Sequence, residues 1–406
     1  MCWLAQLVPP PHTRGPLTYD SFTQDLLPPI LLYYATAVLV LFTGTFGIRL
    51  AILPMTLWSA FRAATRIDLS AGYNDERLIY VNQGLLLAMS VLAARVIIWT
   101  FQLQPYRRLE SPNSPSEKAQ DTSTLSPGRI LIDALDLSWN LRGHGWNWSN
   151  GLQIPPEKRP TSSISVFALA TASSAIQHIL IFDILHYSVQ WFSPSSIGSP
   201  RGGTIFEESM APIQRYSRST LITFLSGLVI YCAIQLAYDL LTLIAMFVFR
   251  QQPSQWPPLF DTPWLASSLT EFWAKRWHQL FRDCFISLGG KPLSLLLGRI
   301  GGVLGAFLIS GILHDFGLWG MGKGTEFQSM GGYFILMGVG IILEHTWRRI
   351  AGVRVGGILG WIWTIMWVVG WGNILVDAWS RRGLVGSVFF PDSIRPTNYI
   401  FGPLFP

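Results

Sequence analysis

The pair His314 and Asp315 stands near the end of the long apolar run LLLGRIGGVLGAFLISGILHDFGLWG. Ionisable residues inside a membrane span are costly and usually functional. On a helix, small residues share the face of the histidine and leave room beside its ring, namely Ser310, Gly311 and Gly317. Burial favours the neutral imidazole, which can accept a proton, so we expect His314 to be a general base.

The same residues allow a structural interpretation. His314 can hydrogen-bond across helices while the glycines permit close packing, and Gly301 and Gly305 have the spacing of such a packing motif. Asp315 points about 100° away from its neighbour on a helix, so we expect it to play a structural or supporting role. The residue pattern alone leaves both interpretations open.

A second stretch with chemical potential precedes this run. Thr270–Asp283 reads TEFWAKRWHQLFRD, with two tryptophans and two phenylalanines on one helical face and basic residues on the other. That pattern predicts an amphipathic helix lying in a membrane interface. Its simplest role is that of a juxtamembrane anchor.

The composition identifies the environment of these residues. Of the 406 residues, 50% are hydrophobic and only 13% are charged, against about 25% charged in a soluble domain. The apolar residues come in long blocks, which predicts a polytopic membrane protein. The net charge of +6 fits an anionic membrane surface or an anionic substrate, and we expect no nucleic-acid partner. Cys2, Cys232 and Cys284 are scattered, which indicates neither disulfides nor a metal site, and the N-terminus lacks the pattern of a cleaved signal peptide.

We therefore expect an all-α helix bundle with about eight transmembrane helices, within a range of seven to nine. The expected spans are residues 30–47, 50–61, 78–101, 163–192, 219–249, 293–319, 332–347 and 355–379. The chain then divides into an N-terminal tail at 1–27, first transmembrane helices at 28–101, a cytosolic loop at 102–162, a membrane core at 163–380 and a C-terminal tail at 381–406.

The loop at 102–162 contains two kinds of sequence. Its first half, SPNSPSEKAQDTSTLSPG, is of low complexity, whereas ILIDALDLSWNLRGHGWNW regains helical spacing and predicts a docked element. Lys and Arg are concentrated in 102–162, 250–291 and 348–354, which places these loops in the cytosol. The glycosylation sequon at Asn147 should therefore be unmodified.

Other ionisable residues in the spans give weaker signals. His178, Asp183 and His186 at i, i+5 and i+8 do not share one compact face, which favours interhelical hydrogen bonds over a metal site. Glu344 and His345 end the seventh expected span, where they can snorkel or contribute to a site.

Three motifs in this order resemble the wax-synthase-like branch of the membrane-bound O-acyltransferases. They are PPLF at Pro257–Phe260, FWxxRWHQ at Phe272–Gln279 and SGxxHD at Ser310–Asp315. The upstream stretch Arg142–Trp146 is similar to the RGxGW element of fungal members. The resemblance covers roughly residues 130–380.

This resemblance implies a mechanism. An acyl-CoA enters from the cytosol, a hydrophobic alcohol enters from the membrane or the opposite side, and both meet in a tunnel-shaped active site. His314 would take the proton of the alcohol as it attacks the thioester. The other implied residues line the site or bind acyl-CoA: Trp273, Lys275, Arg276, Trp277, His278, Gln279 and Arg282. Related sterol and diacylglycerol acyltransferases carry a Trp-Asn pair near the thioester, and His278 or Gln279 replaces the Asn here.

The resemblance also implies the substrates. Fungal members of this length are O-acetyltransferases of terpenoid or meroterpenoid secondary metabolites, which favours acetyl-CoA as co-substrate with no bound cofactor or metal. Plant-like members instead join long acyl chains to fatty alcohols as wax ester synthases. A non-catalytic transporter or scaffold is the alternative from another class. We expect a multi-pass protein of the endoplasmic reticulum, and the sequence indicates no oligomeric state.

Overall fold

The chain folds mainly into helices, which form two compact units. The computed structural model describes residues 8–73, 75–109, 126–149 and 151–404. The first unit contains Met1–Asp75, Ile79–Leu152 and Leu280–Phe327, and the second contains Glu76–Leu78, Gln153–Gln279 and Gln328–Pro406. The named strands of the described residues are two short parallel segments, β1 (Gly15–Pro16) and β2 (Ile67–Asp68). The predicted all-α fold is confirmed, while Cys2, the first seven residues and most of the low-complexity stretch lie outside the described residues.

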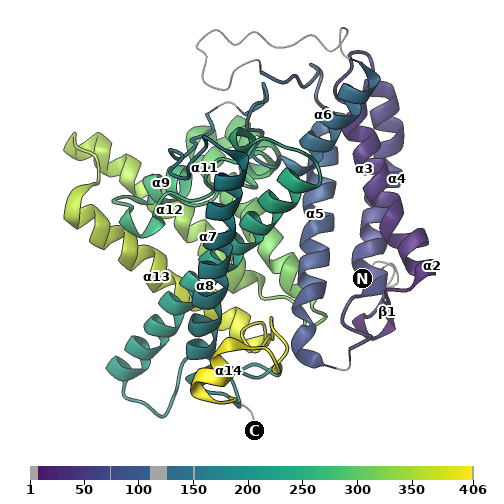
Figure 1. Cartoon of the computed structure of the whole chain (residues 1–406). Helices are drawn as coiled ribbons and strands as arrows, with labels where there is room; N and C mark the ends of the chain where they lie inside the picture. Colours follow the sequence, from purple (N-terminus) through teal and green to yellow (C-terminus); the bar gives the residue numbers. More distant parts are fainter. Residues whose placement is uncertain (1–7, 74, 110–125, 150, 405–406) are drawn as a thin grey trace. The chain divides into compact units, whose positions relative to one another are not determined.

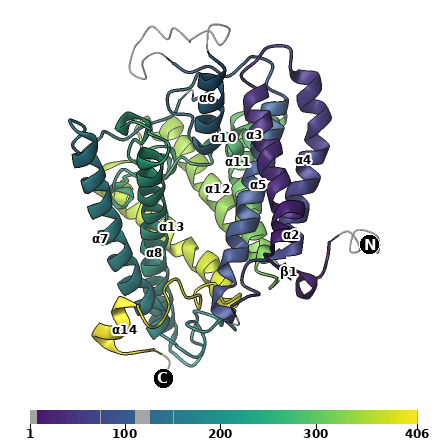
Figure 2. The same cartoon turned by 45° about the vertical axis from the view of Figure 1, so that its right-hand side comes forward.

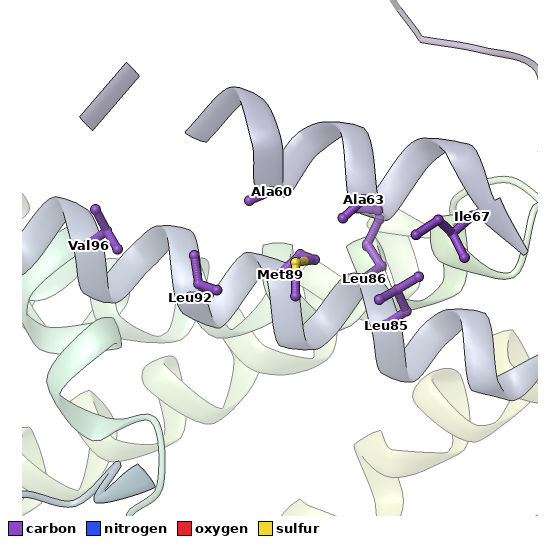
Figure 3. Close-up of a cluster of buried hydrophobic side chains, with 9 residues drawn as sticks. Ala60, Ala63, Ile67, Leu85, Leu86, Met89, Leu92 and Val96 are labelled. Atoms are coloured by element: carbon purple, nitrogen blue, oxygen red, sulfur yellow. The ribbon is translucent and has the colours of Figure 1, made fainter. Parts of the chain in front are cut away.

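The core of the first unit lies between α4 (Phe46–Arg66) and α5 (Tyr80–Thr100). Figure 3 shows Ala60 and Ala63 of α4 opposite the longer side chains of α5, among them Leu86 and Met89. Small residues on one helix let the backbone of the other approach closely, which suits packing inside a membrane. In this pair, α5 is the helix against which the segment that carries His314 packs.

The second half of the 102–162 loop is docked on α5. It begins with α6 (Pro127–Trp139), whose Asp136 accepts hydrogen bonds from Trp146 Nε1 at 2.8 Å and forms an ion pair with Arg108 at 3.0 Å. Arg95 of α5 donates to the carbonyl of Leu137 at 2.7 Å. Buried ion pairs of this kind are stable only when their remaining donors and acceptors are satisfied. The RGHGW turn is therefore held as part of the first unit.

The expected sixth span is interrupted. The elements concerned are α10 (Arg282–Phe285), η8 (Ile286–Gly290) and α11 (Lys291–Gly320). Within α11, Gly298 has φ 60° and ψ −146°, a backbone conformation open mainly to glycine. A single helix over residues 293–319 was expected, and that expectation is wrong because the chain turns at Gly298.

The contacts on either side of Gly298 show that the chain reverses into a helical hairpin. A Cβ on Gly289 would collide with the carbonyl of Gly305, and one on Gly301 would collide with the carbonyl of Leu293. Residues 289 and 305 would be about 24 Å apart along a straight helix. The expected close packing at Gly301 and Gly305 is thus confirmed, and its partner is the preceding arm of the same hairpin.

The second unit is built on four long helices. These are α7 (Ile164–Trp191), α8 (Pro212–Phe247), α12 (Phe327–Ala351) and α13 (Gly357–Arg381). α7 and α8 lie side by side in both Figure 1 and Figure 2. The C-terminal segment with α14 (Pro396–Phe401) is tied to α7, because Asp183 accepts from Arg395 and from the backbone N–H of Thr397, both at 2.8 Å.

Six helical segments of the described residues are long and apolar enough to cross a membrane, where eight spans were expected. One of the six, Arg282–Gly320, contains the hairpin turn at Gly298. The first expected span corresponds to α3 (Leu27–Leu39), whose 13 residues are fewer than the roughly 20 that a bilayer requires. The second corresponds to α4, which has 21 residues but carries Arg49, Arg62 and Arg66. The chain is a multi-pass membrane protein with a helix-bundle architecture.

Candidate active site

His314 lies on the second arm of the helical hairpin in the first unit. Its Nδ1 is 2.7 Å from the carbonyl oxygen of Ser310, one helical turn earlier. A carbonyl oxygen can only accept, so Nδ1 carries the proton and the neutral ring presents Nε2 as its basic nitrogen. Ser310 and Gly311 are both buried. The helix itself thus fixes the tautomer that a general base requires.

The neighbours of His314 have structural roles. A Cβ on Gly317 would approach Gln83 and Leu87 of α5, so this glycine allows α5 and α11 to pack closely rather than leaving space beside the imidazole. Asp315 is buried, and its Oδ1 accepts from the backbone N–H of Glu326 at 2.7 Å. Asp315 therefore holds the turn that follows α11.

The stretch from Thr270 belongs to the second unit up to Gln279, and it is not one interfacial helix. It begins with the single turn α9 (Leu269–Glu271), continues as the π-helical turn η7 (Phe272–Arg276), and becomes extended at Trp277, with φ −79° and ψ 153°. The expected amphipathic helix over Thr270–Asp283 is therefore wrong. Apolar residues fit one helical face, but tertiary hydrogen bonds end the helix before that face is complete.

Gln279 is the side chain that stabilises this irregular turn. Its Nε2 donates to the carbonyl of Trp273 at 2.8 Å and to that of Trp277 at 3.2 Å. Gln279 is only 6% exposed, so these bonds satisfy carbonyls that a broken helix would otherwise leave without partners. Gln279 acts as a support of the backbone here, and the amide does not face outward as a free ligand.

Glu344 of α12 holds the start of the same segment. Its Oε1 accepts from the N–H of Leu269 at 2.5 Å and from Trp363 Nε1 at 3.1 Å. Its Oε2 accepts from the N–H and the hydroxyl of Thr270 at 3.0 and 2.8 Å. Glu344 is buried, whereas His345 is exposed. The sequence suggested only a possible contribution of Glu344, and the structure makes it the anchor of α9.

Aromatic rings surround the extended part of the segment. Trp277 stacks on Phe272 with ring centroids 5.4 Å apart, and its edge meets Phe260 of the PPLF lead-in at 5.1 Å. His278 lies at 5.7 Å from the same Phe260 ring, and Trp273 packs against Phe334 of α12 at 6.3 Å. The lead-in and the FWxxRWHQ block thus form one aromatic layer.

The three basic residues expected to bind acyl-CoA differ in their surroundings. Arg276 donates to Glu271 Oε1 at 2.8 Å, to the carbonyl of Asp261 at 2.9 Å and to Thr262 Oγ1 at 3.1 Å. Lys275 is exposed. Arg276 is therefore a clamp between the lead-in and the block, which argues against its expected role with CoA phosphates.

The bond from Arg276 also affects the ionisation of its acceptor, Glu271. Burial alone would raise its pKa, but hydrogen bonds from Ser267 and Arg276 outweigh that effect, and the pKa of Glu271 lies below its ordinary value. The carboxylate is therefore ionised, and the clamp is intact, at physiological pH.

Arg282, the third predicted basic residue, belongs to the first unit, where its guanidinium lies beside Gly151.

The two histidines of the fourth expected span make hydrogen bonds in different parts of the second unit. His186 donates from Nε2 to the carbonyl of Val385 at 3.0 Å, and His178 bonds to the carbonyl of Ser174 at 2.8 Å. Within the described residues no group of His, Cys, Asp or Glu has the arrangement of a metal site. Sequence reasoning missed Asp239, although an aspartate inside the fifth expected span was a signal in itself.

Comparison with known proteins agrees with the motif order. Residues 256–336, which run from the PPLF lead-in past His314, match the family described as membrane bound O-acyl transferase. Acetyltransferase ple2 of Rhodocybe pseudopiperita is 26% identical over 249 residues, which cover 56% of this chain and 61% of that protein. Acetyltransferase atnC of an Arthrinium species is 27% identical over 329 residues, 73% of each chain.

A plant protein is also similar. The probable long-chain-alcohol O-fatty-acyltransferase 7 of Arabidopsis thaliana is 27% identical over 194 residues, which cover 45% of this chain and 52% of that protein. The chain thus spans less than two thirds of the length of ple2 and of the plant protein.

Proposed function

Since this chain belongs to the membrane-bound O-acyltransferase family through residues 256–336, we propose that it transfers an acyl group from acyl-CoA to a hydrophobic alcohol. The observation that carries the proposal is the hydrogen bond from His314 Nδ1 to the Ser310 carbonyl inside the matched region. It leaves Nε2 as a base on a membrane helix, which is the group that ester formation requires.

The proposed chemistry needs one proton carrier. Nε2 of His314 accepts the proton of the alcohol while its oxygen attacks the thioester carbonyl, forming a tetrahedral intermediate. Collapse of this intermediate breaks the carbon–sulfur bond, and the leaving thiolate of CoA takes the proton back from the imidazolium. A positioned base contributes roughly a factor of 10²–10⁴ to such a rate. No redox or metal chemistry is needed for this balance.

For the donor, we propose that Lys275 and Arg282 contact the phosphates of CoA on the cytosolic face. Lys275 is exposed, and its ammonium is a suitable point charge for a phosphate. Arg276 is left out of this role because its guanidinium bonds to Glu271, Asp261 and Thr262. Trp273, Trp277 and His278 supply the aromatic layer that we propose lies beside the acyl thioester.

Acetyl-CoA is our proposed donor and a terpenoid-type alcohol our proposed acceptor. The support is that two of the relatives described above, ple2 and atnC, are named acetyltransferases. The plant relative is named for long-chain alcohols, which supports fatty acyl transfer as the second candidate. We further propose that the protein resides in the endoplasmic reticulum, where both substrates reach a multi-pass membrane protein.

Microsomes from cells that express the chain test the proposal. They are incubated with labelled acetyl-CoA or palmitoyl-CoA and a panel of polycyclic and fatty alcohols, and labelled esters are quantified. His314→Ala should abolish ester formation while the protein still accumulates in membranes. His345→Ala is the matched control, because His345 is an exposed histidine on α12.

The outcome distinguishes an acyltransferase from a transporter or scaffold. Retained activity in His314→Ala removes this residue as the base. If wild-type microsomes transfer no acyl group from either donor, a transporter or scaffold becomes the better explanation. Preference for palmitoyl-CoA and fatty alcohols would favour the second candidate over acetyl transfer.

A further inference from the structure

A buried polar cluster lies between α7 and α8 in the second unit. Asp239 is only 1% exposed, although it sits in the apolar helix α8. Its Oδ2 accepts from Ser174 Oγ at 2.6 Å and its Oδ1 accepts from Gln235 Nε2 at 2.8 Å. An ionisable group inside a span is costly, so it indicates a function. Its direct effect is to fix the direction of the Ser174 hydroxyl.

The fixed hydroxyl determines the state of His178. Nδ1 of His178 is 2.8 Å from the carbonyl of Ser174 and 3.2 Å from its Oγ. The single hydroxyl proton points to Asp239, so both Ser174 oxygens accept and Nδ1 of His178 must donate. Nε2 of the neutral ring is then an acceptor, and no residue of the described ranges donates to it.

This order of bonds is not that of a hydrolase triad. A nucleophilic serine would donate its proton to a histidine nitrogen, with the carboxylate bound to the other nitrogen. Here Ser174 donates to Asp239, and the basic nitrogen of His178 is on the far side of its ring. The cluster is therefore built to present an acceptor and not to activate a nucleophile.

Tyr231 of α8 supplies a second polar group beside His178. The two ring centroids are 5.7 Å apart, and the Tyr231 hydroxyl makes no hydrogen bond to any residue that the structure describes. Counted from the helix ends at Ile164 and Phe247, both residues lie roughly 20 Å into their spans. Polar groups at such depth are satisfied by protein, water or a ligand. His178 and Tyr231 are two such groups on adjacent helices, with neighbouring rings.

This pair adjoins the aromatic layer of the candidate active site. Tyr231 packs against Phe260 at 4.7 Å and against Trp264 at 5.3 Å. The Phe260 ring in turn meets Trp277 at 5.1 Å and His278 at 5.7 Å. An apolar molecule held against these rings would have one end beside the FWxxRWHQ block and the other beside His178 and Tyr231.

We propose that His178 and Tyr231 form a subsite for a second hydroxyl of the acceptor, distinct from the one that is acylated. The inference rests on the proposed acyltransferase function. The hydroxyl donates to His178 Nε2 and accepts from the Tyr231 O–H, while the aromatic layer packs against the apolar skeleton. The acceptor class is thus a rigid, mostly apolar diol. Each such hydrogen bond contributes about fivefold to affinity, so a diol should bind about 5- to 25-fold more tightly than the matching mono-ol.

Binding of androstanediol and androstanol tests this subsite, because the two probes share a rigid skeleton and differ in one hydroxyl. Full-length protein in nanodiscs is titrated with each probe, without an acyl donor, and dissociation constants come from the shift in thermal unfolding midpoint. The variants are Tyr231→Phe, which removes one oxygen, and His178→Phe. Tyr216→Phe is the matched control, because Tyr216 is an exposed tyrosine on the same helix.

Wild-type protein and Tyr216→Phe should prefer the diol, and the preference should fall about fivefold in Tyr231→Phe. Absence of a diol preference in wild-type protein, or its survival in both Tyr231→Phe and His178→Phe, overturns the proposal. The same titration on His314→Ala protein keeps binding separate from catalysis. A chain that transfers no acyl group but prefers the diol refutes only the proposed function, and an active chain without the preference refutes only the subsite.

Discussion

Glu344 gives the sharpest test of how the aromatic block is positioned. Its two carboxylate oxygens accept four hydrogen bonds, from Leu269, Trp363 and twice from Thr270. The substitution Glu344→Gln preserves the shape of the side chain but replaces one oxygen by an NH₂ group. If the amide nitrogen takes the place of Oε1, it faces the N–H groups of Leu269 and Trp363. If it takes the place of Oε2, it faces the N–H of Thr270, while the Thr270 hydroxyl can turn to accept from it. At least one of the four hydrogen bonds is therefore lost, and the charge is removed from the others.

The magnitude follows from the number of bonds. A hydrogen bond to a charged group contributes about 1.5–3 kcal/mol, and a buried donor left unsatisfied costs a similar amount. One lost bond gives about 1.5–3 kcal/mol, or roughly a 10- to 150-fold change in the equilibrium between the anchored segment and a detached one. Because α9 precedes the block directly, the detached state displaces Trp273 and Trp277 as well.

The assay compares thermal unfolding midpoints in detergent and kcat/KM for acyl-CoA in microsomes. Glu344→Gln should lower both, with protein still present in the membrane fraction. Glu208→Gln is the matched control, because Glu208 is an exposed glutamate of the second unit. A Glu344→Gln protein with wild-type midpoint and wild-type kcat/KM would refute the idea that this carboxylate positions the block.

Three further outcomes are expected. Gly305→Ala should lower the unfolding midpoint, since its Cβ meets the Gly289 carbonyl and overpacking costs about 1–3 kcal/mol, while Gly84→Ala, whose Cβ meets nothing within 4 Å, should not. Because the pKa of Glu271 is lowered in the folded protein, its clamp stabilises the fold fully above the ordinary glutamate pKa near 4.3, and this stabilisation is lost as the pH falls through the folded-state pKa. The unfolding midpoints of wild type and Glu271→Gln should therefore differ by a constant amount between pH 5 and 8 and converge only in stronger acid. Asn147 should show no glycosidase-sensitive gel shift, because its loop is expected in the cytosol; a shift would reverse the predicted orientation.

Hydropathy was sufficient for the long helices but not for the hairpin. The expected spans at 163–192 and 355–379 agree with α7 and α13 within a few residues, because a long apolar run in a membrane has few alternatives to a helix. The reversal at Gly298 has no such signal, since leucines and glycines continue on both sides. The one residue that could have indicated it is Gly298 itself. Glycines are frequent in ordinary membrane helices, so a single glycine does not predict a turn.

Sequence motifs indicated which residues to expect in the candidate site, but they could not indicate its geometry. The motif order located His314 and the FWxxRWHQ block, and both lie within the family match. Periodicity could not reveal that Gln279 bonds to two carbonyls, or that Arg276 spans Glu271 and Asp261. Those contacts depend on a non-helical path at Trp277, and apolar spacing cannot distinguish such a path from a regular helix.

The two histidines with proposed ligand contacts share one local arrangement. His314 follows Ser310 by four residues and His178 follows Ser174 by four, and each Nδ1 bonds to the carbonyl of its serine. A histidine whose Nδ1 donates to a carbonyl of its own helix has its tautomer fixed, so Nε2 is the basic nitrogen in both. The adjacent Asp315 accepts from the backbone N–H of Glu326. Glu344 and Asp315 thus satisfy backbone N–H groups and Asp239 orients a hydroxyl, while Nε2 of His314 and Nε2 of His178 are the nitrogens that we propose contact the substrate.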